Sequence, residues 1–120
     1  MSKESWEVQE LELWIMNDEP LYNHMTLVCK NLIRKHAAGI YNRNKAVKAF
    51  QYTVTMAAKK YHKSFNEKGH WYTFFPKQDR ERVAKNIRDN FEEEARLGTY
   101  DKYIPKKYQG KVTGKTICHL

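Results

Sequence analysis

The sequence predicts an all-α fold, a compact bundle of about four helices followed by an extended, partly mobile C-terminal tail. Apolar residues recur at intervals of three and four in four stretches of the chain, which is the period of a helix with one buried face. No convincing alternation of the strand type extends beyond four residues. Proline, glycine and asparagine separate the four stretches, so each helix has a local reason to end.

The first predicted helix begins near Ser2 or Ser5, either of which can act as its N-cap, and ends at Asn17. Its apolar face consists of Trp6, Val8, Leu11, Trp14 and Ile15. Pro20 disfavours helical geometry in the residue before it and can open the next helix, so the break falls at 17–20.

The second predicted helix opens at Pro20 and ends at Gly39, because glycine readily adopts the left-handed conformation that closes a helix. Its spacing is typical of a buried stripe, formed by Leu21, Met25, Val28, Cys29, Leu32 and Ile33.

The third predicted helix has the clearest pattern and runs from a cap at Asn42 or Asn44 to about Phe65. Its core face spans about 100° of arc and consists of Val47, Phe50, Val54, Ala57, Ala58, Tyr61 and Phe65. The opposite face carries a basic stripe, called the lysine stripe below, which consists of Lys45, Lys48, Tyr52, Lys59 and Lys63.

An aromatic block at 70–75 separates the third helix from the fourth. Trp71, Phe74 and Phe75 are spaced like one helical turn and are expected to close one end of the bundle. The alternative is an exposed surface for a partner protein, for which Trp71 and Tyr72 are the candidates. The fourth helix has Pro76 near its first turn and ends at Gly98, with a core face of Val83, Ala84, Ile87, Phe91, Ala95 and Leu97. Two pairs at i, i+4, Glu81 with Lys85 and Arg88 with Glu92, are expected to support it.

The sequence predicts a single helical domain at 1–108 and a flexible tail at 109–120. Tyrosines and lysines alternate in 99–108, which we expect to be extended and to lay its tyrosines on the helical body. A chain of 120 residues with 41% apolar residues is long enough for one modest core.

The formal charge of +8 is unevenly distributed along the chain. Residues 1–19 carry one Lys and six acids, whereas 20–98 carry 16 basic and seven acidic residues and 99–120 carry five Lys and one Asp. No apolar run is long enough to span a membrane, the first ten residues do not resemble a signal peptide, and the two cysteines form no motif. We therefore expect a cytoplasmic protein that does not enter a membrane.

Several strings along the chain resemble a family of small uncharacterised proteins of bacteriophages and mobile elements. They are residues 10–18, 21–22, 45–48, 58–61, 71–76, 82–84 and 105–108, so the resemblance covers about residues 8–108. It brings no activity, cofactor or functional residue. It implies an accessory protein that acts inside a bacterium.

No catalytic or metal-binding motif occurs in the sequence. The five histidines include no H-x₃-H pair, and the Glu92-Glu93-Glu94 carboxylates point in different directions on a helix. We expect no catalytic residue, no metal site and no cofactor, and therefore no enzyme.

Two functions remain open. The first is binding of nucleic acid or a nucleoprotein through the lysine stripe, with Arg34, Lys35 and Arg43 as residues that would widen the basic patch. A narrower form of this hypothesis is a helix-turn-helix made by the second and third helices. The second function is a protein–protein module, either an inhibitor or adaptor of a bacterial host protein or a homodimer, which requires an exposed Trp6, Trp14 or Trp71.

Overall fold

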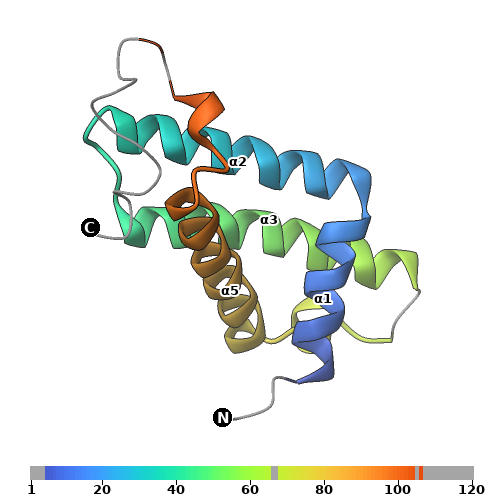
Figure 1. Cartoon of the computed structure of the whole chain (residues 1–120). Coiled ribbons are helices and arrows are strands. Elements are labelled where there is room, and N and C mark those ends of the chain that lie inside the picture. The colour runs from blue at the N-terminus through green and yellow to red at the C-terminus, as the bar shows by residue number, and fades with distance from the viewer. Residues whose placement is uncertain (1–4, 66–67, 105, 107–120) are drawn as a thin grey trace.

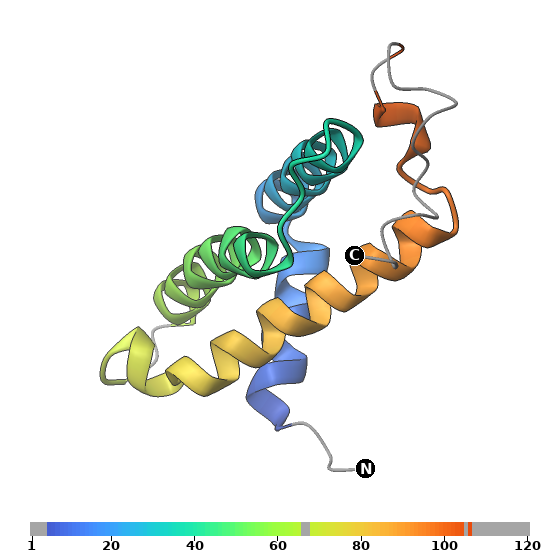
Figure 2. The same cartoon turned by 90° about the vertical axis from the view of Figure 1, so that its left-hand side faces the viewer.

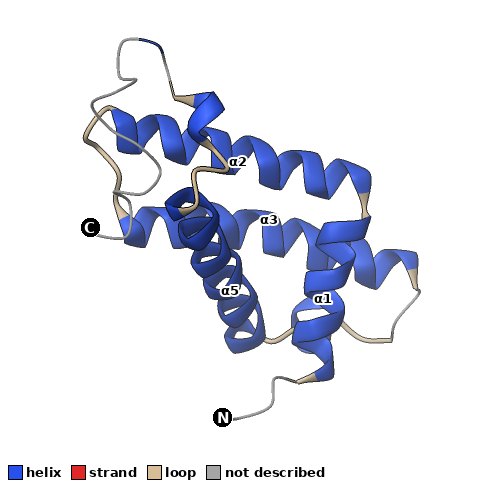
Figure 3. Cartoon of the chain, viewed as in Figure 1, coloured by secondary structure: helices blue, strands red, loops and turns tan. Residues whose placement is uncertain are grey.

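Four long helices and two short ones form the described part of the chain, in which no strand occurs (Figures 1 and 3). A computed structural model describes residues 5–65, 68–104 and 106. Its elements are α1 (Trp6–Asn17), α2 (Glu19–Ala37), α3 (Arg43–Ser64), α4 (Trp71–Phe74), α5 (Lys77–Arg96) and the 3-10 helix η1 (Asp101–Tyr103). The all-α prediction is confirmed, and the four long helices match the four predicted ones.

Polar side chains cap the starts of three long helices. The side chains of Ser5, Asp18 and Asn42 each accept a hydrogen bond from the backbone N–H three residues further on, at 3.3, 3.2 and 3.0 Å. Each bond satisfies a donor that has no partner within the helix. Ser5 and Asn42 are among the expected caps. Asp18 lies in the predicted break between the first two helices and is the N-cap of α2.

Glycines end two of the long helices. Gly39 and Gly98 have φ angles of 77° and 84°, in the left-handed region that glycine adopts without strain. At both sites the two backbone N–H groups after the helix donate back to carbonyls of its last turn, at 2.9 to 3.0 Å. This is the Schellman arrangement, and it explains why both helices end where the sequence predicts.

The helices form two layers. Helices α2 and α3 lie side by side and run in opposite directions, and both α1 and α5 cross the same side of this pair (Figures 1 and 2). The remaining side of α3 faces away from α1 and α5. The lysine stripe lies on this side of α3, opposite its core face.

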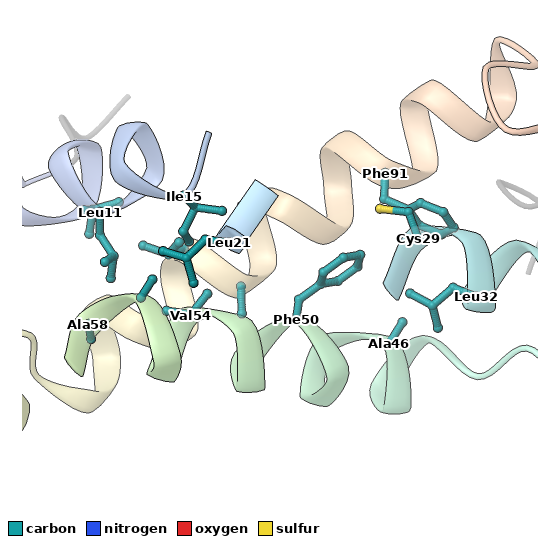
Figure 4. Close-up of a cluster of buried hydrophobic side chains, with 14 of the residues drawn as sticks. Leu11, Ile15, Leu21, Cys29, Leu32, Ala46, Phe50, Val54, Ala58 and Phe91 are labelled. Carbon is teal, nitrogen blue, oxygen red and sulfur yellow. The ribbon is translucent and has the colours of Figure 1, made fainter. Parts of the chain in front are cut away.

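The core lies between the two layers and takes residues from every long helix. Figure 4 shows Leu11 and Ile15 of α1 facing Val54 of α3, while Phe50 of α3 faces Phe91 of α5. Other buried members are Leu21, Cys29, Leu32, Ile33, Ala46, Ala57, Ala58, Val83, Ala84 and Ala95. Burying one such large apolar side chain contributes about 1.5–3 kcal/mol, so this core is the main source of stability.

Three residues predicted to lie in the core are exposed. They are Trp6 at the start of α1, Phe65 at the end of α3 and Leu97 after α5. At about 100° per residue, Trp6 lies 140–180° around α1 from Val8, Leu11 and Ile15, so it is on the side of the helix that faces away from the core. Phe65 and Leu97 are the residues that follow the last turns of α3 and α5. Phe65 still packs its ring against Trp14, at 5.5 Å between centroids.

The segment after α5 folds onto the helices in a short turn. We expected an extended segment over 99–108, but 101–103 form η1. Ile104 is buried, and the Tyr100 ring packs on Phe91 at 5.2 Å between centroids, so the expected contact of this segment with the helical body is present. Pro105 and 107–120, including the predicted flexible tail at 109–120, lie outside the described residues.

Candidate nucleic-acid interface

The lysine stripe is a continuous exposed face of α3. Its members Lys45, Lys48, Tyr52, Lys59 and Lys63 are all exposed and fall within about 60° of arc at about 100° per residue. Lys45 and Lys63 are 18 residues apart, which corresponds to about 27 Å along the helix. The sequence of α3 contains no Asp or Glu, so no acidic group of the helix itself offsets this charge.

The stripe lysines differ from Arg43 and Lys60, the other cations of α3, in having no ion pair among the described residues. Arg43 is paired with Glu92 at 2.9 Å, and Lys60 is paired with Asp18 at 2.9 Å. Within the described ranges, no acidic group forms an ion pair with any of the four stripe lysines. The charges of the stripe therefore remain available to an external anion, whereas those of Arg43 and Lys60 are already balanced by Glu92 and Asp18.

Tyr52 stands in the middle of the stripe and is 63% exposed. The imidazole of His24 on α2 lies beside its ring, at 5.7 Å between centroids. An exposed aromatic ring flanked by lysines offers a flat apolar surface next to positive charge, which is the combination that nucleobases stack on.

Lys59 differs from the other stripe lysines because it contacts the aromatic block. Its Nζ lies 5.1 Å from the centre of the Trp71 ring, and the Arg80 guanidinium lies 4.9 Å from the same centre. Cations over an indole ring are stabilised by its quadrupole. The contacts tie α4 to α3 and to α5 at the far end of the stripe.

The aromatic block faces partly inward. Phe75 is fully buried, as the expected end plug requires, but Trp71 and Phe74 are only half-buried. Tyr72 is exposed and stacks on His70 at 4.9 Å between centroids. Of the two candidate partner-surface residues, Tyr72 is therefore the accessible one, and Trp71 is occupied by its two cations.

A second basic feature, which the sequence analysis missed, lies on α5. A groove of about 650 Å³ lies at the surface between α3 and α5, and its cationic lining residues are Lys48, Lys77, Lys85 and Arg88. Those from α5 are spaced by eight and three residues and so share one face of that helix. The spacing is visible in the sequence, but only the packing of the two helices reveals that this face borders the lysine stripe.

Glu92 anchors the start of α3 next to this groove. Its carboxylate accepts hydrogen bonds from Arg43 Nε and Nη2, at 2.9 and 3.0 Å, and from the Tyr41 hydroxyl at 3.1 Å. The hydrogen bond and the charge of Glu92 raise the pKa of Arg43. Burial, followed by the Glu92 charge, raises the pKa of Tyr41 well above its ordinary value, so the phenol stays protonated and donates. The expected Arg88–Glu92 pair is also present, at 4.0 Å.

The structure also bears on the other sequence-based hypotheses. Helices α2 and α3 run antiparallel side by side, whereas the two helices of a helix-turn-helix cross at about 90–120°, so that motif is absent from this pair (Figures 1 and 2). Arg34 and Lys35 are exposed in the last turn of α2, but Arg43 is engaged by Glu92 and does not widen the patch. The predicted Glu81–Lys85 pair is replaced by Lys77–Glu81, at 3.8 Å.

Neither a metal cluster nor a membrane-spanning segment is found in the described residues. No group of three or more His, Cys, Asp or Glu side chains there is placed to hold a metal ion. No helix among them has both the length and the apolar content that crossing a membrane requires. Comparisons of the chain with protein-family models, with curated proteins and with solved structures found no match.

Proposed function

We propose that this protein is a non-enzymatic basic module that binds nucleic acid or a nucleoprotein through the lysine stripe. The observation that carries this proposal is the contrast between the cations of α3. Two of them are used in ion pairs, whereas Lys45, Lys48, Lys59 and Lys63 have no acidic partner in the described part of the chain. Like charges on one helix face repel one another and destabilise the helix slightly. A polyanion bound to this face would remove the repulsion, which is why we propose it as the ligand.

The proposal includes a context that rests on resemblance. From the likeness to proteins of bacteriophages and mobile elements, we further propose that the module acts as an accessory factor in the cytoplasm of a bacterial host. Binding of a polyanion does not depend on this context, because it requires only the charge and the exposure of α3.

Charge reversal on the stripe tests the proposal. Lys48→Glu with Lys63→Glu changes two exposed lysines that make no ring contact, so the melting temperature should stay within about 2 °C. Binding of a fluorescein-labelled 20-nucleotide strand and a 20-base-pair duplex is measured by anisotropy at several salt concentrations. We expect the affinity to fall at least about 100-fold. The slope of the logarithm of the association constant against the logarithm of the salt concentration should become shallower by about 1.5–2, because two fewer phosphates are neutralised.

The matched control is Lys102→Glu with Lys106→Glu, which makes the same change in net charge on the C-terminal segment, where both lysines are exposed. It should lower the affinity by a few-fold at most. If the control weakens binding as much as the stripe variant, the attraction comes from net charge and the stripe is not the site. Wild-type protein that binds neither probe at 50 mM salt would also end the proposal.

A second candidate is a protein–protein module, and α1 favours it. Trp6 is 58% exposed and Leu13 is 56% exposed, and at about 100° per residue both lie on the outer side of α1, opposite the core residues Leu11 and Ile15. A helix with apolar residues on both sides normally has both sides covered. We propose a bacterial host protein or a second copy as the partner on this face.

This second candidate makes a separate prediction. Leu13→Glu should abolish capture of a partner from nuclease-treated bacterial lysate, or dissociate a dimer in sedimentation, while leaving nucleic-acid binding unchanged. Iodide should quench Trp6 fluorescence in the free protein, since Trp6 is the most exposed of the three tryptophans. A monomer whose tryptophans are all shielded from iodide would count against the candidate.

A further inference from the structure

The groove between α3 and α5 runs beside the lysine stripe and shares Lys48 with it. Its lining contains four cations and one carboxylate, Glu81. Glu81 lies 3.8 Å from Lys77, and Arg88 is held by Asp89 at 2.7 Å. Lys48 and Lys85, one from each wall, have no acidic partner among the described residues. An anion in the groove would therefore meet unpaired positive charge on both sides.

The groove also offers neutral hydrogen-bonding groups. The amide side chains of Asn44 and Gln51 line its α3 wall. At the start of α3 it continues into a second recess of about 440 Å³, with which it shares Asn44 and Arg88. Cations alternating with amides along such a path suit a chain of phosphates, whose oxygens accept from both.

Tyr52 is positioned next to this path. It follows Lys48 by four residues, and side chains at this spacing are neighbours on a helix, about 5–6 Å apart between Cβ atoms. A phosphate at Lys48 would thus leave the adjoining base within reach of the exposed Tyr52 ring. A positively charged groove with an exposed aromatic ring at its edge is the pattern by which proteins hold single strands.

The surroundings of α3 do not suit a duplex. Reading duplex DNA requires a protruding helix or ribbon that enters a major groove about 12 Å wide, and a helix with its side chains is itself about 10–12 Å across. The exposed face of α3 is bordered closely on one side by His24 of α2, which contacts Tyr52, and on the other by α5 across the groove. Neighbouring helices therefore flank the exposed face, and α3 does not project from the molecule.

We propose that the ligand of this surface is single-stranded nucleic acid, with its phosphates in the α3–α5 groove between Lys48 and Lys85 and a base stacked on Tyr52. This rests on the proposed function and names the class of nucleic acid that it selects. It also adds Lys85, on a different helix, to the residues of the stripe.

The test compares three labelled probes on the full chain: a 15-nucleotide oligo(dT), a 15-nucleotide oligo(rU) and a 15-base-pair duplex of mixed sequence. At least one single strand should bind about 10-fold more tightly than the duplex. Lys85→Glu, on an exposed α5 residue outside the stripe, should weaken single-strand binding at least about 5-fold. Tyr52→Ala should weaken it about 5- to 100-fold, and Tyr52→Phe, which keeps the ring, by less than about 3-fold.

The outcomes separate this inference from the proposed function. If the duplex binds as tightly as both single strands, or if Lys85→Glu and Tyr52→Ala stay within about 2-fold of wild type while the stripe reversal abolishes binding, the inference is wrong and the proposed function stands. If none of the probes binds, both fail. Unchanged melting temperatures for Lys85→Glu and Tyr52→Ala keep loss of folding from being mistaken for loss of binding.

Discussion

Replacing Glu92 with glutamine removes the charge that holds the start of α3 against α5. The Glu92 side chain is only 11% exposed and accepts two hydrogen bonds from Arg43 and one from Tyr41. Glutamine keeps the shape and one carbonyl oxygen, so it loses the charge and at least one of these bonds.

The expected cost follows from these contacts. A hydrogen bond to a charged group contributes about 1.5–3 kcal/mol, and a buried charge that loses its partner costs more. The Arg43 side chain is 46% exposed and can be rehydrated, so we expect Glu92→Gln to lower the free energy of unfolding by about 2 kcal/mol. For a chain of this length that corresponds to a fall in melting temperature of about 8 °C.

The assay is urea unfolding followed by circular dichroism, with Glu93→Gln as the matched control. Glu93 is the next residue of α5, and its partner Arg96 lies in the same helix, with both side chains about half exposed. We expect Glu93→Gln to leave the unfolding midpoint nearly unchanged. A double-mutant cycle with Arg43→Ala should give a coupling of at least about 1 kcal/mol for Glu92. If Glu92→Gln unfolds at the same urea concentration as Glu93→Gln, the anchoring role assigned to Glu92 is wrong.

Further predictions concern a cap, the core and alkaline pH. Asp18→Ala should destabilise the protein by about 1–2 kcal/mol because it removes the N-cap of α2, whereas Asp18→Asn keeps a capping oxygen and should cost less than half as much in the same urea assay. Phe50→Ala should cost about 3–5 kcal/mol because Phe50 is fully buried against Phe91, and a thermal scan that finds less than about 1.5 kcal/mol would contradict the assigned core. Burial raises the pKa of Tyr41 above the ordinary value of about 10, so the folded phenol stays protonated while the unfolded chain ionises. Stability is therefore fully present below about pH 10 and should fall above it, and Tyr41→Phe should flatten that fall between pH 9.5 and 11.

Burial raises the pKa of Cys29 to about 11, so its thiol should react slowly in the folded protein. In a Cys118→Ser variant, a disulfide reagent at pH 8 should label Cys29 only as fast as the protein opens, and denaturant should accelerate it by orders of magnitude. Rapid labelling of the native variant would show that Cys29 is accessible.

The sequence by itself determined the helices and their faces. Ser5, Asn42, Gly39 and Gly98 act on the backbone within three to five residues of themselves, so the ends they set could be inferred without knowing the fold. The same holds for the lysine stripe, because helical geometry alone places its residues opposite the core face.

The tertiary structure decided what each face meets. Glu92 and Arg43 are 49 residues apart, and nothing local distinguishes Glu92 from Glu93 or Glu94, yet packing makes the first a buried anchor and leaves the second exposed. Phe65 fits the core face of α3 and is nonetheless 54% exposed, because it lies just beyond the last turn of that helix. The groove that joins Lys85 to the stripe exists only where α3 and α5 cross. The sequence therefore predicts the α3 wall of the candidate site, because helical periodicity alone sets it. The α5 wall depends on contacts between residues far apart in the chain, which the sequence pattern does not reveal.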